Sequence, residues 1–346
     1  MAEDDHDQPA DTMRGRVPGS RLRLWFLLEA DRWVVTAVTL GLVFASLVVI
    51  GTLDPTPLRR TIAGSDPVET LFQALVAAIV TGVTLVVTIN QLVLSQELGA
   101  VGDQRERMEA AMAFRRDVED ALGVAAVPAA PAGFLRTIVE AAGERGEALR
   151  DAVPADADGA LRERVGDDVD GLASNADEVA ARLDGAEFGT FDVVAAALDF
   201  NYSWKISEAR RLRAAHGDQL GEEAAAAVDE LVEALELFGP AREHVKTLYF
   251  QWELIDLSRA ILYASVPALV VATGAVLYLA DPGTVTGSTA GVDHVVLAVS
   301  GATAAALLPF AILLSYVLRI ATVAKRTLAI GPFILRGSAR DADRRE

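Results

Sequence analysis

A row of polar, uncharged side chains runs through the apolar stretch formed by residues 71–94. Drawn as a helix at 100° per residue, the row falls within a sector of about 80°. Its members, with one alanine among them, are Gln73, Ala77, Thr81, Thr84, Thr88, Gln91 and Ser95. If several copies turned this face toward a common axis, its hydroxyls and amides would replace part of an ion's hydration shell, as in a pore wall. The alternative is a helix-packing face, on which each threonine bonds its own backbone and only Gln91 needs a partner.

Charged residues and prolines mark the edges and interiors of two later apolar stretches. Glu253, Asp256 and Arg259 precede one of them, and a spacing of three places Asp256 and Arg259 close enough to form an ion pair. Pro267 and Pro309 lie inside apolar stretches, where each removes one backbone hydrogen bond and is expected to bend the helix. We expect these five residues to couple the internal helices of the protein to its membrane-spanning helices.

The sequence holds no recognisable catalytic or metal-binding motif. Four histidines are present, His6, His216, His244 and His294. They show none of the close spacing that a zinc site requires. The sequence also lacks a phosphate-binding loop and a nucleophile elbow, and the absence of cysteine excludes disulfides, thiolate metal ligands and cysteine nucleophiles. Acidic pairs such as Asp167 and Asp168 lie in strongly charged stretches and are interpreted as solvated surface. We therefore expect a protein that is not an enzyme and binds no cofactor or metal.

Four apolar stretches must position these residues. They cover residues 33–53, 71–94, 261–279 and 295–318, and none of them contains Asp, Glu, Lys or Arg. Because about 20 helical residues cross the ~30 Å core of a bilayer, each stretch is long enough to span it. The predicted fold is therefore all-α, an integral membrane protein with four transmembrane helices, two before and two after an inserted helical bundle.

Basic residues set the predicted orientation. Five arginines lie within residues 1–32, before the first span, whereas residues 280–294 contain no lysine or arginine. The positive-inside rule then places both termini and the inserted domain in the cytoplasm of a cell-membrane protein. The predicted order is a cytoplasmic tail with an interfacial helix at residues 22–28 (1–32), spans one and two (33–94), an acidic cytoplasmic helical domain (95–256), spans three and four (257–324) and a cytoplasmic tail (325–346).

The acidic middle of the chain is predicted to be helical almost throughout. The chain has 49 acidic and 31 basic residues, and nearly the whole acidic excess lies in residues 96–256, which are rich in alanine, leucine, glutamate and arginine. Glycine and proline predict about five helices, with breaks near residues 123–131, 154–156, 185–189 and 217–221. Apolar residues spaced three and four apart from Phe191 to Leu212 predict one continuous packed helix face. The second and third spans are expected to continue as helices into this domain, with Gly99 and Gly102 as the positions at which the second could bend.

The charge composition limits the partners and indicates a habitat. A net charge of −18 argues against nucleic-acid binding. The chain has 28 arginines but only three lysines, and in this it resembles proteins of salt-in halophilic archaea. The resemblance implies that the carboxylates serve solvation, because molar salt shortens the Debye length to about 3 Å and screens their mutual repulsion.

Two spans, a helical cytoplasmic insert and two further spans, with both termini inside, resemble the layout of the bestrophin-like anion channels. The resemblance covers most of the chain in layout, and no residue motif accompanies it. It implies a pentamer around a pore lined by the second span. Members of that family have hydrophobic constriction residues in the pore helix, where this sequence has threonine and glutamine.

Two functions of different kinds follow from these patterns. The leading one is a homo-oligomeric ion channel or pore lined by the second span, with Thr81, Thr84, Thr88 and Gln91 along the path. The alternative is a non-conducting, membrane-anchored signalling or scaffolding protein whose helical domain binds a cytoplasmic protein. A transporter is disfavoured because no span holds an ionisable residue to couple ion movement. The expected partners are the lipid bilayer, further copies of this chain and, for the alternative, that cytoplasmic protein.

Overall fold

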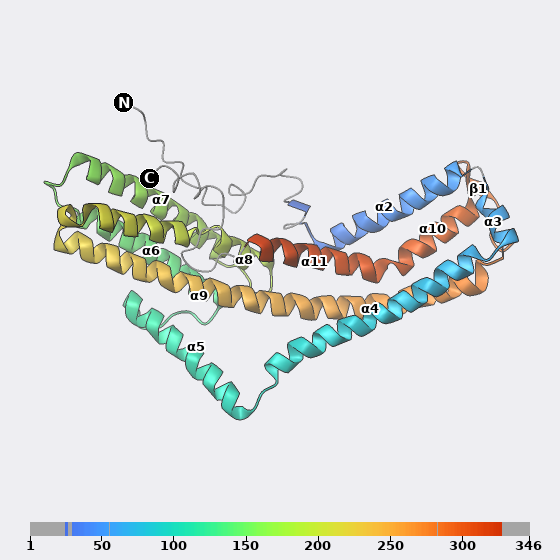
Figure 1. Ribbon diagram of the computed structural model, residues 1–346, viewed down its shortest axis with the longest axis horizontal. Helices are drawn as coiled ribbons and strands as arrows, with labels where there is room; N and C mark the ends of the chain where they lie inside the picture. The colour runs from blue at the N-terminus through green and yellow to red at the C-terminus, as the bar shows by residue number, and fades with distance from the viewer. Residues whose placement is uncertain (1–24, 27–29, 55, 282, 327–346) are drawn as a thin grey trace. The chain divides into compact units, whose positions relative to one another are not determined.

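Helices account for most of the described chain. The computed structural model describes residues 25–26, 30–54, 56–281 and 283–326 (Figure 1). The predicted interfacial helix at residues 22–28 lies outside the described residues, apart from Trp25 and Phe26, and the predicted C-terminal tail lies outside them from residue 327 onward. The chain divides into two compact units. We call Gly99–Phe250 the bundle unit, and the described residues up to Leu98 together with Gln251–Val323 the apolar unit.

Among the described residues, three helices are long and apolar enough to cross a membrane, and a bent pair forms a fourth candidate. The three are α2 (Arg32–Leu53), α4 (Pro67–Glu97) and the apolar part of α9 (Tyr202–Tyr278), and the pair is α10 (His294–Ala306) with α11 (Leu308–Arg326). The connections contain the helix α3 (Leu58–Gly64) and the strands β1 (Ser288–Thr289) and β2 (Val292–Asp293). These helices agree with the predicted helical membrane protein, whereas the arrangement of the spans about a cytoplasmic domain stays a prediction.

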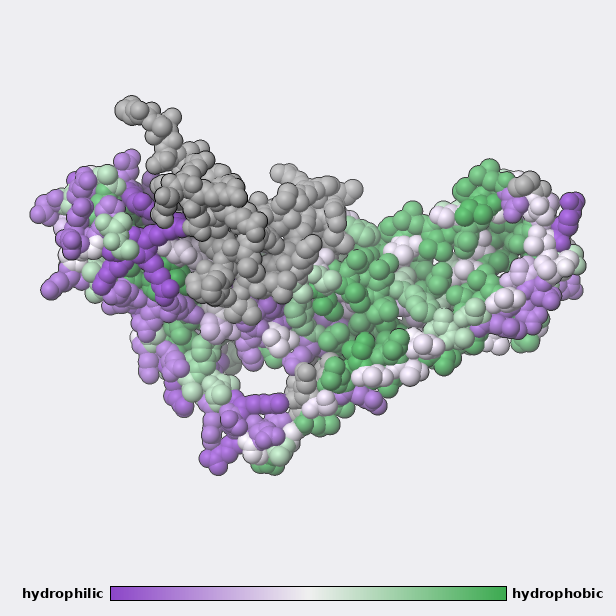
Figure 2. Space-filling model, viewed as in Figure 1, coloured by the Kyte–Doolittle hydropathy of each residue, from purple (hydrophilic) through white to green (hydrophobic). Residues whose placement is uncertain are grey.

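The surface of the apolar unit is hydrophobic along its long helices. Leu42 of α2, Val80 of α4 and Val266 of α9 are 64%, 53% and 64% exposed. Figure 2 shows the surface over these helices as predominantly green. An exposed apolar surface that spans several helices indicates contact with lipid or with further protein rather than with water, which supports membrane association.

The core of the apolar unit forms where α4 packs against α9 and α10. Phe72, Ile79 and Val86 of α4 are spaced seven apart, so they share one helix face, and all three are buried. Ala268 and Ala272 of α9 belong to the same apolar cluster as Phe72 and Ile79, together with residues of α10. Alanines at these positions let the helix backbones approach closely, which is how helices associate within a membrane.

The two prolines of the spans have different effects. Helices α10 and α11 are bent by 48° at Leu307, and Pro309 lies in the first turn of α11, where its missing N–H breaks no intrahelical bond. A bend is present next to Pro309, as predicted, but the predicted cause, a hydrogen bond lost inside a continuous helix, is wrong because a new helix begins at Leu308. Pro267 lies within α9, whose non-helical backbone angles occur at His216 and Gly221, so the helix continues through Pro267.

A tight hairpin connects α9 to α10. Strands β1 and β2 pair antiparallel, with Thr289 opposite Val292, so the turn consists of Ala290 and Gly291. Their φ angles are 51° and 84°, the left-handed values of a type I′ turn, and Ala290 is the non-glycine residue with positive φ in the described chain.

Replacing Ala290 with asparagine should stabilise the hairpin by about 0.5–1 kcal/mol. Asparagine tolerates the left-handed region because its side chain bonds locally, and Asn-Gly is the preferred pair for this turn. The midpoint of thermal unfolding in detergent measures the gain. Ala290→Val is the control, because its β-branched side chain should lower the midpoint at the same position.

An ion pair joins α3 to the start of α10. The Arg59 guanidinium donates to both carboxylate oxygens of Asp293, over 3.1 and 2.7 Å, and to the Val285 carbonyl over 2.7 Å. Asp293 also caps α10, because its carboxylate accepts from the N–H of Val295 over 3.0 Å. These contacts hold the connection between α9 and α10 against the helix that precedes α4.

The Asp293 contacts should make stability depend on pH. The hydrogen bond from Arg59, and then that from Val295, lower the pKa of Asp293 below its ordinary value. A carboxyl with a lowered folded-state pKa stabilises the fold above its unfolded pKa of about 3.9, and that contribution is lost as the pH falls through the folded-state pKa. The difference in unfolding midpoint between wild type and Asp293→Asn should therefore be complete at about pH 5–7 and should shrink below about pH 4. A difference that stays constant down to about pH 3 would contradict this.

The bundle unit contains helices that pack around one core. They are α5 (Val101–Leu122), α6 (Pro131–Ala152), α7 (Gly159–Leu183), α8 (Phe191–Leu198) and the first part of α9. Phe200, Phe238 and Tyr249 are fully buried, and the rings of Phe200 and Phe238 meet edge to face with their centroids 4.9 Å apart. Three of the predicted breaks separate α5, α6, α7 and α8, and the fourth coincides with the non-helical angles at His216 and Gly221.

The continuous helix face predicted from Phe191 to Leu212 is wrong at one place. Helix α8 ends at Leu198 and α9 begins at Tyr202. The side-chain amide of Asn175 on α7 donates to the Asp199 carbonyl over 3.0 Å, and Arg182 pairs with the Asp199 carboxylate. Tertiary contacts thus stabilise a non-helical backbone between Leu198 and Tyr202, even though the apolar spacing continues across this break.

The two predicted helix continuations have opposite outcomes. Helix α9 continues from the bundle unit through the third predicted span, as expected. Helix α4 ends at Glu97 and α5 begins at Val101, because Leu98 and Ala100 take extended backbone angles on either side of Gly99. The second span therefore does not continue as one helix, and the interruption lies at Gly99, one of the two glycines expected to bend it.

Candidate functional site

The polar row predicted on the second span lies on the outward face of α4. We call its six polar residues the polar stripe: Gln73, Thr81, Thr84, Thr88, Gln91 and Ser95. All six are exposed, whereas Phe72, Ile79 and Val86 on the opposite face are buried. The helix thus uses its apolar face to pack within the chain and leaves the polar stripe uncovered.

Apolar side chains flank the polar stripe on both sides. Val80 and Val87 lie beside one edge, and Leu85 and Leu92 lie beside the other, at 100° per residue. These four side chains are 53%, 39%, 61% and 62% exposed. The outward face of α4 is therefore a polar strip between two exposed apolar strips, a pattern that suits a helix with neighbours on both sides and water in front.

The hydroxyls of the polar stripe donate to their own helix. Thr81, Thr84 and Thr88 bond the carbonyls four residues earlier over 2.9, 3.0 and 2.9 Å, and Ser95 bonds the Leu92 carbonyl over 2.7 Å. Each hydroxyl proton is therefore engaged, and the remaining lone pairs of the oxygen are left to accept from, or coordinate, whatever lies in front of the helix. The backbone bonding expected for the packing-face alternative is present. The threonines are nevertheless exposed, so this face does not pack against another described helix of the same chain.

The amides of the polar stripe differ in their contacts. The Gln73 amide donates to the Glu69 carboxylate over 2.9 Å, one turn earlier. Gln91 makes no side-chain hydrogen bond within the described part of the chain. Asn90, the residue that precedes Gln91, also has an exposed amide. It was not predicted as part of the polar row because it lies outside the 80° sector.

A buried charge cluster connects three helices of the apolar unit, α2, α9 and α11. Arg32 at the start of α2 donates through Nε to the Glu253 carboxylate of α9 over 3.0 Å, and its guanidinium lies 4.5 Å from the centre of the Tyr316 ring of α11. Arg319 of α11 donates to the Ala30 carbonyl. Glu253 and Arg319 are only 5% and 8% exposed, so these charges are shielded from water.

The residues predicted to couple the internal helices to the spans do not form one site. Glu253 belongs to the charge cluster, whereas Asp256 is half-buried and Arg259 is exposed. Asp256 and Arg259, both described, form no ion pair with each other, so the predicted pair is wrong. Pro267 is exposed on α9, and Pro309 is buried at the bend between α10 and α11. Their predicted role in coupling stays a prediction.

Sequence reasoning missed three members of the charge cluster. Arg32 entered the sequence analysis only as one of the five arginines that set the orientation, Arg319 was not singled out, and Tyr316 lies in the fourth apolar stretch. The available signal was position: both arginines directly flank a predicted span, where a bilayer-facing charge would be costly unless it found a carboxylate or a carbonyl.

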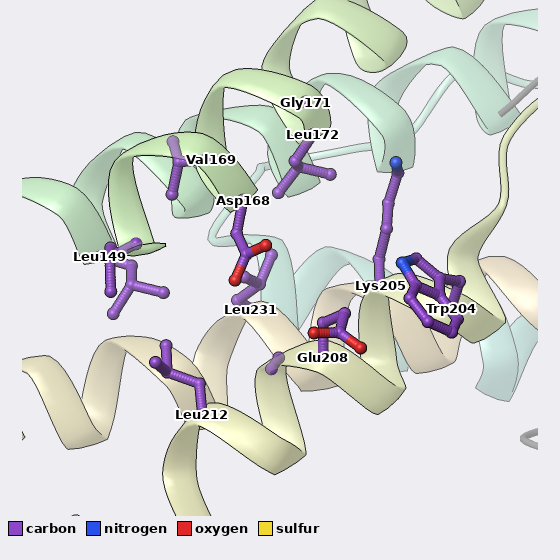
Figure 3. A pocket seen from close by; sticks show the side chains of 12 residues that line it. Leu149, Asp168, Val169, Gly171, Leu172, Trp204, Lys205, Glu208, Leu212 and Leu231 are labelled. Atoms are coloured by element: carbon purple, nitrogen blue, oxygen red, sulfur yellow. The ribbon is translucent and has the colours of Figure 1, made fainter. Parts of the chain in front are cut away.

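A small cavity in the bundle unit is lined by α6, α7 and α9. Its volume is about 60 Å³, less than half of the roughly 150 Å³ that binds a benzene molecule in an apolar cavity. Figure 3 shows the carboxylates of Asp168 and Glu208 on facing helices among leucine and valine side chains. Arg164 and Arg211 donate to Glu208 over 3.2 and 3.1 Å, and Arg164 Nε lies 4.0 Å from Asp168. Arginine side chains of the bundle unit thus pair with both carboxylates. We interpret the cavity as part of an ion-paired contact between helices and not as a ligand site.

Metal-ligating side chains do not gather elsewhere in the described ranges. No group of three or more histidine or acidic side chains is placed to hold a metal ion among these residues. His216 lies at the non-helical turn of α9 with its buried Nδ1 lacking a hydrogen-bond partner, and His294 bonds Thr289 and the Thr286 carbonyl.

Comparison with known proteins places the chain in a family but gives no activity. No curated protein and no solved structure matches the chain. A family model matches it over residues 1–346, and its description is a family of unknown function, DUF7972. Because the match covers the whole length, the chain belongs to the DUF7972 family.

Proposed function

We propose that the protein is a homo-oligomeric ion channel or pore of the cell membrane, lined by α4. The observation that supports this most directly is the exposure of the polar stripe opposite a fully packed apolar face. The hydroxyl protons of the polar stripe are bonded within α4, but the Gln91 amide has no hydrogen bond among the described residues, and an amide at hydrocarbon depth needs a polar partner. The described part of α4 packs within the chain through its other face, so further copies of α4 or water would supply that partner.

A ring of protomers would satisfy both parts of the outward face of α4. The apolar strips at Val80, Val87, Leu85 and Leu92 would pack against neighbouring helices, and the polar stripe would face the axis. Both termini and the bundle unit would lie in the cytoplasm, as the arginine distribution favours. This proposal shares its layout with the bestrophin-like channels, in which the second span lines the pore of a pentamer.

Single cysteines test this proposal sharply, because the chain has none of its own. We expect the purified protein to be a closed oligomer in mild detergent and to conduct in planar bilayers. A charged thiol reagent should block current through Thr88→Cys. Ile89→Cys, which is exposed but turned about 100° from Thr88, is the matched control and should not respond. A monomeric protein in mild detergent would contradict the proposed ring. Block of Ile89→Cys without block of Thr88→Cys would show that the polar stripe of α4 does not line the pore.

A second candidate is a non-conducting membrane-anchored scaffold, and α5 favours it. Residues 101–112 of α5 are all exposed, including Met108 and Met112 at 62% and 40%. This first half of α5 is exposed within the bundle unit, and an exposed amphipathic helix can dock into a groove of a partner protein. If Met108→Asp and Met112→Asp abolished the binding of a cellular protein while wild-type vesicles passed no current, the scaffold would replace the channel.

A further inference from the structure

We propose that the pore formed by α4 selects cations over anions. This inference rests on the proposed function and deepens it by naming the class of ion. It follows from the direction in which the polar groups of α4 are bonded and from the charges at the start of that helix.

The hydroxyls of the polar stripe present acceptors. Thr81, Thr84 and Thr88 each use their only proton on a backbone carbonyl of α4, over 2.9–3.0 Å, and Ser95 does the same over 2.7 Å. What these four hydroxyls turn away from the helix is a ladder of oxygen lone pairs, which suits a cation or a water hydrogen. The amides of Gln73 and Gln91 offer an oxygen as well as N–H donors, so they favour neither sign of ion. An anion would need the opposite, a row of free N–H or O–H donors. To supply them, each hydroxyl would have to give up its bond within the helix.

The fixed charges on this face of α4, or next to it, are negative. Helix α4 contains no lysine or arginine along its whole length, and its first turn carries Glu69. Asp66 directly precedes the helix, is exposed, and makes no capping hydrogen bond through its side chain. At 100° per residue Asp66 falls in line with Thr84, and Glu69 falls about 60° away. A ring of copies would thus place two carboxylates per protomer at one mouth of the path.

Two positive contributions oppose these carboxylates and are smaller. The N-terminus of α4 carries a helix-dipole charge of about +0.5, which does not cancel the two carboxylates at −1 each. On α3, Arg59 is already paired with Asp293, and Arg60 is exposed with no ion pair to another described residue. Even counting Arg60 in full, the mouth keeps a negative charge of about half a unit per protomer, and this charge is multiplied around a ring.

The reversal potential of the reconstituted full-length protein tests the inference. In a tenfold gradient of KCl we expect the reversal potential to lie closer to the equilibrium potential of potassium than to that of chloride. Potassium should be at least about fivefold more permeant than chloride. Glu69→Gln keeps the size and the hydrogen bond to Gln73 but removes the charge, and should lower that ratio at least twofold. Asp66→Asn, whose side chain caps nothing, is a second variant with the same expected direction. Arg60→Gln is the matched control of opposite sign and should not lower the ratio.

The outcomes separate the two proposals. Wild-type currents that reverse at zero, or closer to the equilibrium potential of chloride, would overturn cation selection. The proposal that α4 lines a pore would not be affected. Currents that select potassium equally well in wild type, Glu69→Gln and Asp66→Asn would overturn the role of the acidic mouth. An absence of current in the wild type under every gradient would overturn the pore, and the selectivity would fall with it.

Discussion

Replacing Glu253 with alanine should destabilise the apolar unit by about 3–5 kcal/mol. The change removes the Glu253 carboxylate from the Arg32 guanidinium, whose side chain is only 14% exposed. Removing one partner of a buried ion pair costs more than most single substitutions. The free energy of unfolding in lipid–detergent micelles, measured by denaturant titration, should show the loss.

Two comparisons isolate the buried charge as the cause. Glu109→Ala removes the carboxylate of an exposed pair with Arg105 on α5, whose side chains are 63% and 79% exposed, and should cost no more than about 0.5 kcal/mol. Replacing both partners, with Arg32→Met and Glu253→Leu, should cost clearly less than Glu253→Ala alone, because the guanidinium charge is removed together with the carboxylate. A single substitution that costs less than about 1 kcal/mol would show that water reaches the cluster.

The long apolar helices of this protein were predictable from sequence because their signal is local. A run without charged residues over 18 or more positions is enough to identify α2 and the apolar part of α4, and both occur close to their predicted limits. The polar stripe was predictable for a similar reason, since the angle between Thr84 and Thr88 depends only on helical geometry. That this stripe is exposed was not predictable, because exposure depends on which helices pack against the other face of α4.

The charge cluster and the break before α9 depended on contacts between distant residues. Arg32 and Glu253 are 221 positions apart, and no periodicity links them. The end of α8 depends on Asn175, which bonds the Asp199 carbonyl from another helix. Gly51 is similar: a Cβ there would lie 2.7 Å from a methyl group of Val296, so glycine is required by a neighbouring helix and not by its own. Such features follow from tertiary packing and leave no periodic trace in the sequence.

Replacing both Thr84 and Thr88 with valine should reduce the conductance of the reconstituted protein by about 100-fold. Valine keeps the volume of threonine but removes the oxygen that would face an ion or a water molecule. An intramembrane hydrogen bond is worth about 0.6 kcal/mol, and a ring repeats its loss in every copy. For five copies, the loss at one ring alone raises the barrier by about 3 kcal/mol, which corresponds to the stated factor. Single-channel recordings at fixed salt measure it.

The same substitutions have a different effect if the polar stripe is a packing face. Each threonine already bonds its own backbone, so valine would then change stability by about 1 kcal/mol or less and leave conductance unaltered. Ser46→Val, at an exposed position of α2, controls for general effects of an added apolar side chain in the spans. Currents that are equal in wild type and in the double valine variant would take the conducting path away from α4, even if the protein conducts.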